Sequence, residues 1–323
     1  MSWAERLIGL ATLRLWRWAT GSRERLRADA RPVERPDDPE AWLAVREAGI
    51  RPDVASYMQW AGAPGQVTDL AILYVHGFSA SPAELRPLPE RVARAVGANL
   101  LAIRLTGHGQ GGGDLAAARV EDWWHDVGQG IAVAEGLGRR VVILGMSTGA
   151  TLAAMAACEP QRGSRIAGVI LISPNFALRR KAADVLKVPL ARLVLRILGN
   201  PVRGFVPRNQ LHRDGWTYSY PVAALLPVVA LLRRARAGNY RSATVPALIL
   251  WSVSDRIVDH RATVKVIRMW GGRVTVRHVR PGPSDDPDAH VIAGNALSPH
   301  LTNDLVAIIA RWLCAESKLR TSG

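Results

Sequence analysis

The pentapeptide Gly145-Met146-Ser147-Thr148-Gly149 constrains the fold of this chain more than any other sequence feature. An apolar run, Val141 to Leu144, precedes it and a stretch rich in small residues follows, so the pattern predicts a strand, a sharp turn and a helix. Glycines flank the central residue of such a turn where a Cβ atom would clash. The turn projects the side chain of Ser147 away from the sheet, which makes it a candidate nucleophile. A purely structural turn is the alternative.

A serine nucleophile needs a histidine base and a carboxylate that orients the base. Asp255 lies in the loop after a predicted buried strand, Ala247 to Trp251, and is the candidate carboxylate. Asp259 is its competitor. Because Asp259 stands directly before the amphipathic stretch His260 to Trp270, its position favours a helix N-cap. We therefore assign the carboxylate role to Asp255.

The chain has eight histidines, and one of them has the position that a base requires. His290 follows the last predicted strand, Val274 to Val279, and precedes a predicted closing helix near Leu301 to Leu313. It can therefore reach back over the sheet edge toward Ser147. The other seven lie in glycine loops, in a basic loop, in a strand, at a helix start or beside aromatic or proline residues.

Ester hydrolysis also needs N–H donors that are aimed at the negative oxygen of the tetrahedral intermediate. A predicted strand, Leu70 to Val75, is followed by a turn at His76-Gly77-Phe78. The expected donors are the main-chain N–H groups of Phe78 and of Thr148, the residue after the nucleophile. For His76 we expect a ring that braces the loop by bonding nearby backbone.

Five separated motifs carry a resemblance to a known family. They are Val75-His76-Gly77-Phe78, Leu105-Thr106-Gly107-His108-Gly109, the Ser147 pentapeptide, Ser254-Asp255-Arg256-Ile257-Val258 and His290-Val291-Ile292. Together they resemble the signature set of α/β-hydrolase carboxylesterases, and within that superfamily bacterial monoacylglycerol lipases and lysophospholipase-like esterases. The resemblance implies an α/β-hydrolase fold whose mostly parallel central sheet is flanked by helices. It implies a catalytic triad of Ser147, Asp255 and His290, with Phe78 and Thr148 forming the oxyanion hole.

The resemblance implies a serine carboxylester hydrolase that cleaves an uncharged or lipid-like ester through an acyl-enzyme. The same triad serves thioesterases, amidases and carbon–carbon bond hydrolases. A noncatalytic, membrane-associated binding protein that kept the fold is the alternative of another class. The glycine-rich segment 110–114, together with Met146 and Thr148, departs from the commonest family residues, so the sequence leaves the substrate open.

Length and composition predict one large core, because the chain has 323 residues and is 48% hydrophobic. We expect a hydrolase domain at residues 41–323. A long connection follows the predicted strand Val169 to Ile172, and long connections in compact domains are usually functional. We expect a helical cap over Ser147 at about residues 174–244, with apolar helices at Lys181 to Leu198 and Pro221 to Ala237. Ordinary core packing of a crossover helix pair is the alternative.

The two cysteines, Cys158 and Cys314, are too few for a disulfide framework. Both lie in predicted helices, so we expect buried thiols. Neither context indicates a metal site, and we expect no cofactor.

The N-terminal unit, residues 1–40, has a different pattern. Met1 to Thr20 combines tryptophan, leucine and arginine at helical spacing, which suits peripheral contact with a membrane interface. A helix packed on the hydrolase body or on a second subunit is an equal alternative, and the oligomeric state is open. Arg31 to Pro39 is rich in proline and charge and indicates a linker.

The net charge of +15 points to anionic membranes more than to nucleic acid. The basic residues are dispersed, and no known nucleic-acid-binding motif accompanies them. No apolar stretch is long enough for a transmembrane helix. We expect a cytoplasmic protein with peripheral contact at the inner membrane surface.

Overall fold

The computed structural model describes residues 31–159, 166–179, 195, 197 and 199–321. The amphipathic segment Met1 to Thr20 lies outside the described residues, as does most of the predicted cap helix Lys181 to Leu198.

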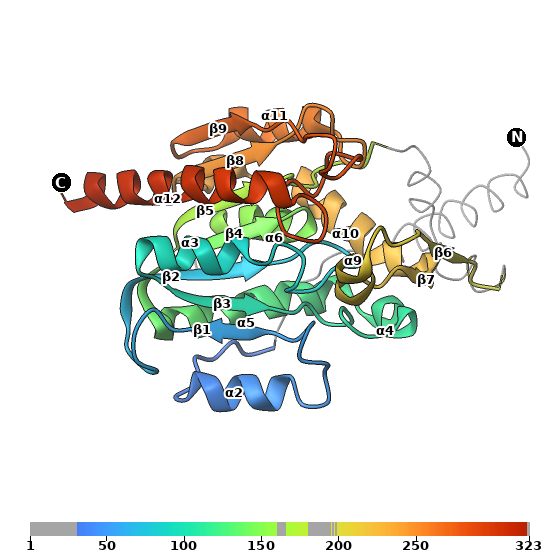
Figure 1. Ribbon diagram of the computed structural model, residues 1–323, viewed down its shortest axis with the longest axis horizontal. Coiled ribbons are helices and arrows are strands. Elements are labelled where there is room, and N and C mark those ends of the chain that lie inside the picture. The colour runs from blue at the N-terminus through green and yellow to red at the C-terminus, as the bar shows by residue number, and fades with distance from the viewer. Residues whose placement is uncertain (1–30, 160–165, 180–194, 196, 198, 322–323) are drawn as a thin grey trace, which may run out of the picture.

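A seven-stranded sheet forms the centre of the described chain (Figure 1). Its strand order is β1-β3-β2-β4-β5-β8-β9, where β1 runs antiparallel to β3 and every other neighbouring pair is parallel. The prediction of a mostly parallel central sheet is confirmed. The strands are β1 Tyr57–Gln59, β2 Thr68–Val75, β3 Asn99–Ile103, β4 Gly138–Met146, β5 Ile166–Ile172, β8 Ala247–Trp251 and β9 Val274–His278.

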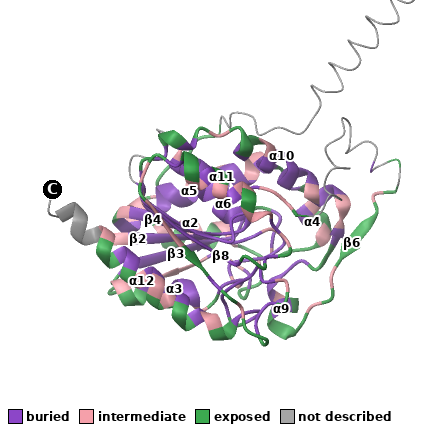
Figure 2. Ribbon diagram, turned by 90° about the horizontal axis from the view of Figure 1, so that it is seen from above, coloured by how far each residue is buried: buried purple, intermediate pink, exposed green. Residues whose placement is uncertain are grey.

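Helices cover both faces of this sheet (Figure 2). One layer contains α5 (Val120–Leu137), α6 (Thr148–Ala157), α10 (Leu225–Arg236) and α11 (His260–Met269), and the other contains α3 (Leu88–Val96) and α12 (Pro299–Thr321). Successive residues of β2 alternate between the layers, since Leu73 and Val75 pack toward α5 and α6 whereas Ile72 and Tyr74 pack toward α3 and α12. Burial on both faces explains the continuous apolar runs within β2, β3, β4, β5 and β8.

The parallel arrangement brings the carboxyl ends of β2, β4 and β8 to one edge of the sheet. The segments that follow these ends carry Phe78, Ser147 and Asp255. In open parallel sheets this edge is where ligands bind. The fold therefore collects the predicted site residues from distant parts of the chain.

The insertion between β5 and β8 is more varied than the sequence predicted. Its described part contains β6 Val202–Gly204, α9 Gln210–Gly215, β7 Ser219–Pro221, η2 Val222–Ala224, α10 and η3 Tyr240–Ser242. The antiparallel pair β6 and β7 was not predicted, because three-residue strands leave no readable alternation. Helix α10 packs against α6 and buries Leu231 in the main core. This contact agrees with the alternative to a cap, the ordinary core packing of a crossover helix pair. The extent of a cap over Ser147 stays a prediction.

The N-terminal part of the described chain lies beside β1 (Figure 1) and is hydrogen-bonded to the residues that follow β1 and β3. Helix α2 (Pro39–Arg46) is capped by the side chain of Asp38, which accepts hydrogen bonds from the N–H groups of Glu40 and Ala41. The expected domain boundary at residue 40 therefore lies inside a helix. A further short helix, α4 (Gly112–Ala117), follows β3.

The expectation of two buried thiols is wrong for Cys314, which is exposed on α12, and Cys158 is half-buried at the end of α6. No helix among the described residues is both long and apolar enough to span a bilayer.

Candidate active site

Ser147 occupies a strained turn between β4 and α6. Its φ of 50° and ψ of −109° are rare for a residue with a side chain, and such conformations cost on the order of 1–3 kcal/mol. The neighbouring chains leave no room for side chains at the flanking glycines. A Cβ on Gly145 would lie 2.6 Å from the Cα of Ala150, and one on Gly149 would overlap the carbonyl oxygen of Val75. The sequence pattern thus reflects close backbone packing at the turn.

The structure brings Ser147, His290 and Asp255 into one chain of hydrogen bonds. The Nε2 atom of His290 lies 2.9 Å from the Oγ of Ser147, and its Nδ1 lies 2.7 Å from the Oδ2 of Asp255. The other oxygen of Asp255 accepts the N–H groups of Ile257 and Val258 at 2.8 and 2.9 Å. Asp255 is fully buried, and these bonds fix its orientation.

Asp259, the competing carboxylate, has a different partner. Its Oδ1 accepts the N–H of Arg261 at 3.0 Å and caps the N-terminus of α11. The predicted N-cap role is confirmed.

A second buried aspartate, which the sequence reasoning missed, shapes the turn that carries His290. The Oδ2 of Asp286 accepts the N–H of His290 at 3.1 Å and that of Val291 at 3.0 Å. Ala289 adopts a φ of 52° in the same turn. Asp286 sits in the turn-rich segment 281–289, where an aspartate is ordinary, so no local signal distinguished it.

Opposing effects act on the pKa of His290. Burial alone would lower it, but the carboxylates of Asp255, Asp286 and Glu84 raise it, and the net result is a pKa above the ordinary value of 6.5. A proton taken up by His290 is therefore held more tightly than in water. This suits a base that must form an imidazolium next to a buried carboxylate.

The loop after β2 places Phe78 beside the turn of Ser147. The ring of His76 accepts the N–H of Leu105 at its Nε2 (3.0 Å), so its Nδ1 carries the proton and donates to the carbonyl of Gly77 at 2.8 Å. Burial keeps the pKa of His76 well below its ordinary value, which favours the neutral ring. This is the bracing role expected for His76. It fixes the peptide group whose other end is the N–H of Phe78.

Thr148, the other expected donor residue, is the first residue of α6 and is buried. The N–H groups of a helix's first turn have no partner within the helix. The Thr148 N–H is therefore free of intrahelical bonding beside Ser147.

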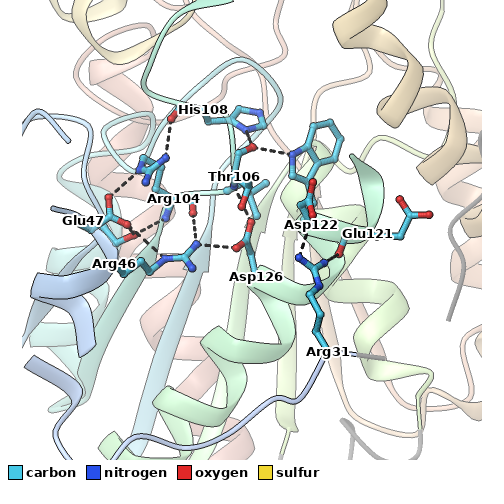
Figure 3. Close-up of polar contacts among 12 residues, drawn as sticks. Arg31, Arg46, Glu47, Arg104, Thr106, His108, Glu121, Asp122 and Asp126 are labelled. Carbon is cyan, nitrogen blue, oxygen red and sulfur yellow. Dashed lines mark hydrogen bonds and ion pairs between the residues drawn. The ribbon is translucent and has the colours of Figure 1, made fainter. Parts of the chain in front are cut away.

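A polar network supports the neighbouring loop 105–108 from the N-terminal side of the fold (Figure 3). The Oδ2 of Asp126, on α5, accepts the N–H of Thr106 at 2.7 Å. Its Oδ1 pairs with the guanidinium of Arg46 at 2.8 Å, and Arg46 also donates to the carbonyl of Arg104. Helix α2 is thereby tied to the loop.

Arg104 forms the second half of this network (Figure 3). It pairs with the Oε2 of Glu47 at 2.7 Å and donates to the carbonyl of His108 at 3.1 Å. The ring of His108 packs against Phe78 and Trp123, with ring centroids 5.9 and 5.3 Å away. The network therefore reaches the residue expected to stabilise the oxyanion.

Comparison with known proteins agrees with this arrangement. A family model described as "Alpha/beta hydrolase family" matches residues 72–307. A thermostable monoacylglycerol lipase of Bacillus sp. (strain H-257) is 26% identical over 189 residues, which make up 58% of this chain and 72% of the lipase.

Solved structures share the fold. A structure described under "LipS and LipT, two metagenome-derived lipolytic enzymes" has a TM-score of 0.66 at 22% identity, covering 83% of this chain and 99% of that one. The monoacylglycerol lipase of Paleococcus ferrophilus has a TM-score of 0.59 at 18% identity, covering 81% and 99%. At these identities the likeness is one of fold alone.

Proposed function

Since the chain belongs to the alpha/beta hydrolase family, we propose that it is a serine carboxylester hydrolase that cleaves an uncharged or lipid-like ester through an acyl-enzyme. Its lipase and esterase homologues make it a hydrolase of that general type. The continuous chain of hydrogen bonds from Ser147 through His290 to Asp255 is the observation that carries the proposal.

The proposed reaction has two halves. Neutral His290 takes the proton of Ser147 as its Oγ attacks the ester carbonyl carbon, and the N–H groups of Phe78 and Thr148 stabilise the oxyanion. The imidazolium then protonates the leaving alcohol, and an acyl-enzyme forms. In the second half His290 removes a proton from water, which attacks the acyl carbon, and Ser147 regains a proton as the acid departs. Asp255 holds the ring and stabilises its charged form.

Apolar surroundings support a substrate with an apolar group. Phe78 packs against a small buried cluster of Leu115, Tyr220 and Ala224, and the ring centroids of Phe78 and Tyr220 are 5.4 Å apart. Burial of each fully enclosed CH₂ group contributes about 0.8 kcal/mol to binding. Turnover should therefore change with acyl chain length, which a series of p-nitrophenyl esters measures.

Replacement of Ser147 by alanine is the first test. Ser147→Ala should abolish turnover of p-nitrophenyl esters and covalent labelling by a fluorophosphonate, because both need the Oγ nucleophile. Ser173 offers a matched control, since it also follows a strand with a positive φ of 43° and is buried. Ser173→Ala should be labelled and active. Labelling at another serine, or full turnover by Ser147→Ala, would remove Ser147 from the mechanism.

A further inference from the structure

Glu84 is a buried carboxyl that the proposed mechanism does not use. Glu84 follows Gly77 by seven residues in the sequence, and it is only 3% exposed. No ion pair among the described residues includes it, although a buried carboxylate is costly unless it is paired or hydrogen-bonded. Its hydrogen-bond partners are the N–H of Gly77, 2.7 Å from Oε2, and the hydroxyl of Tyr74, 3.3 Å from the same oxygen.

These contacts place the Glu84 carboxyl against residues 76–78, the oxyanion loop, which carries the expected donor Phe78. The carboxyl of Glu84 holds the N–H side of Gly77, while His76 holds its carbonyl. A Cβ on Gly77 would lie 2.8 Å from the Oε1 of Glu84 and 3.4 Å from the Cβ of Ser147. Gly77 therefore lies close to both the Glu84 carboxyl and the candidate nucleophile. The next residue, Phe78, supplies the expected oxyanion donor.

Glu84 also contacts the segment that follows His290. A Cβ on Gly294 would lie 2.5 Å from the carbonyl oxygen of Glu84, so the two main chains pack closely. The negative charge of Glu84 contributes to the raised pKa of His290, along with those of Asp255 and Asp286. One residue is thus coupled both to the oxyanion loop and to the base.

Several groups around Glu84 determine its charge. Burial raises the pKa of its carboxyl to about 7, against the lowering effects of the Gly77 N–H, of His290 and of the Tyr74 hydroxyl. Beyond Tyr74 lie Tyr57 and Glu90, which interact electrostatically with the Tyr74 hydroxyl. The Glu84 carboxyl can therefore change charge near neutral pH, next to the base.

We propose that Glu84 is a positioning residue for the ester hydrolysis. Its carboxyl fixes the main chain of Gly77, so that the Phe78 N–H stays aimed at the oxyanion, and it provides a negative charge that stabilises the imidazolium of His290. The inference rests on the proposed function of the same site. It adds a residue that none of the five sequence motifs contains.

Two substitutions separate the two effects of Glu84. Glu84→Gln keeps an oxygen that accepts the Gly77 N–H but removes the charge, whereas Glu84→Ala removes both. Loss of a whole oxyanion donor costs about 100- to 1,000-fold in kcat, so a displaced donor in Glu84→Ala should lower kcat by about 10- to 100-fold with little change in KM. At high pH, where His290 is neutral, Glu84→Gln should have most of the wild-type kcat that Glu84→Ala loses.

The pH profile of Glu84→Gln should also move. His290 loses a negative neighbour, so its pKa falls and the rising limb of kcat/KM shifts to lower pH. Glu90→Gln is the matched control, because Glu90 is also a buried carboxyl but pairs with Arg86, whose side chain is half exposed. It should change neither kcat nor the profile.

A measurement without substrate separates this inference from the proposed function. NMR titration of the His290 ring should give a lower pKa in Glu84→Gln than in the wild type, and an unchanged pKa in Glu90→Gln. An unchanged His290 pKa in Glu84→Gln, or wild-type kcat in a folded Glu84→Ala, would overturn the positioning role. An inactive wild type would refute the proposed function, while the titration would still decide on Glu84. If Glu84→Ala does not fold, Glu84→Gln alone decides.

Discussion

Three aspartates in the loops after β8 and β9 have different hydrogen-bond partners. Asp255 accepts the ring N–H of His290, Asp286 accepts the main-chain N–H of His290, and Asp259 caps α11. Their side chains are chemically identical, so the roles depend on which donor each carboxylate faces. Single substitutions at these positions should therefore have different consequences.

Replacing Asp255 by asparagine should lower kcat by about 10,000-fold, because the histidine ring then loses the acceptor that selects its tautomer. Asp259→Asn should keep nearly full activity, and since asparagine is also a good N-cap, stability should fall by no more than about 0.5 kcal/mol. Ester turnover and thermal unfolding of the two purified variants decide the assignment. A folded but inactive Asp259→Asn variant would show that the carboxylate is assigned to the wrong residue.

The wild-type pH dependence follows from the state of His290. Only the neutral ring can accept the Ser147 proton, so kcat/KM should rise with pH as His290 loses its proton. Because the neighbouring carboxylates raise the pKa of His290, the midpoint of this limb should lie above 6.5, and activity should fall as the pH drops through it. A pH series with a soluble ester measures this midpoint. A midpoint at or below the ordinary value would contradict the electrostatic account.

At the scale of elements, the parts predicted well are those whose sequence reflects local burial. The predicted strands from Leu70 to Val279 lie in or overlap β2, β4, β5, β8 and β9. The runs in β2, β4, β5 and β8 are apolar because they are buried on both faces, whereas β9 at the sheet edge is only partly buried and was predicted from its alternating pattern. The Ser147 turn and the Asp259 cap were predictable for a related reason, since short-range backbone geometry dictates their residue types.

Contacts between distant polar residues could not be predicted. Arg46 and Asp126 are 80 positions apart, and Arg104 and Glu47 are 57 apart. In the sequence each of them looks like a charge on a solvated face. Glu84 is concealed in the same way, because nothing in its neighbourhood shows that its carboxyl turns toward Gly77. The hydrogen-bond chain of the candidate site was predicted residue by residue, whereas the groups that support it were not.

The α2–α5 connection can be tested through Asp126. Asp126→Ala removes the acceptor of the Thr106 N–H and the shorter of the two ion pairs of Arg46, whose other partner is Glu47 at 3.4 Å. The unfolding free energy should therefore fall by about 3 kcal/mol. Asp126→Asn should lose less, since it keeps an acceptor for Thr106. Asp69→Ala is the control, because the ion pair of Asp69 with Arg139 is exposed and should contribute less than about 1 kcal/mol. Urea unfolding measures all three. Equal stability of Asp126→Ala and Asp69→Ala would show that the network contributes little.

At the scale of the whole molecule, an ion pair and hydrogen bonds attach the N-terminal segment of the described chain to α5. Arg31 pairs with Asp122 at 3.0 Å and donates to the carbonyl of Glu121, and Glu34 exchanges hydrogen bonds with Gln129. These contacts join the segment after residue 30 to α5. A truncation that begins at Arg31 therefore keeps every described contact of this segment, and it removes only the tryptophan- and arginine-rich part.

Deleting residues 2–30 tests the proposed peripheral membrane contact. None of the candidate site residues lies in that segment, so hydrolysis of a small soluble ester should be nearly unchanged. Cosedimentation with anionic vesicles and attack on aggregated lipid esters should weaken, because tryptophan rings and arginines favour an anionic interface. Binding by the full chain should fall between low and moderate salt, since screening reduces the arginine contribution, and zwitterionic vesicles are the control. Equal binding of the full chain and the truncated chain to anionic vesicles would refute membrane contact through residues 2–30. Insoluble truncated protein would instead favour a helix packed on the hydrolase body or on a second subunit, because removal of such a helix exposes the apolar surface that it covers.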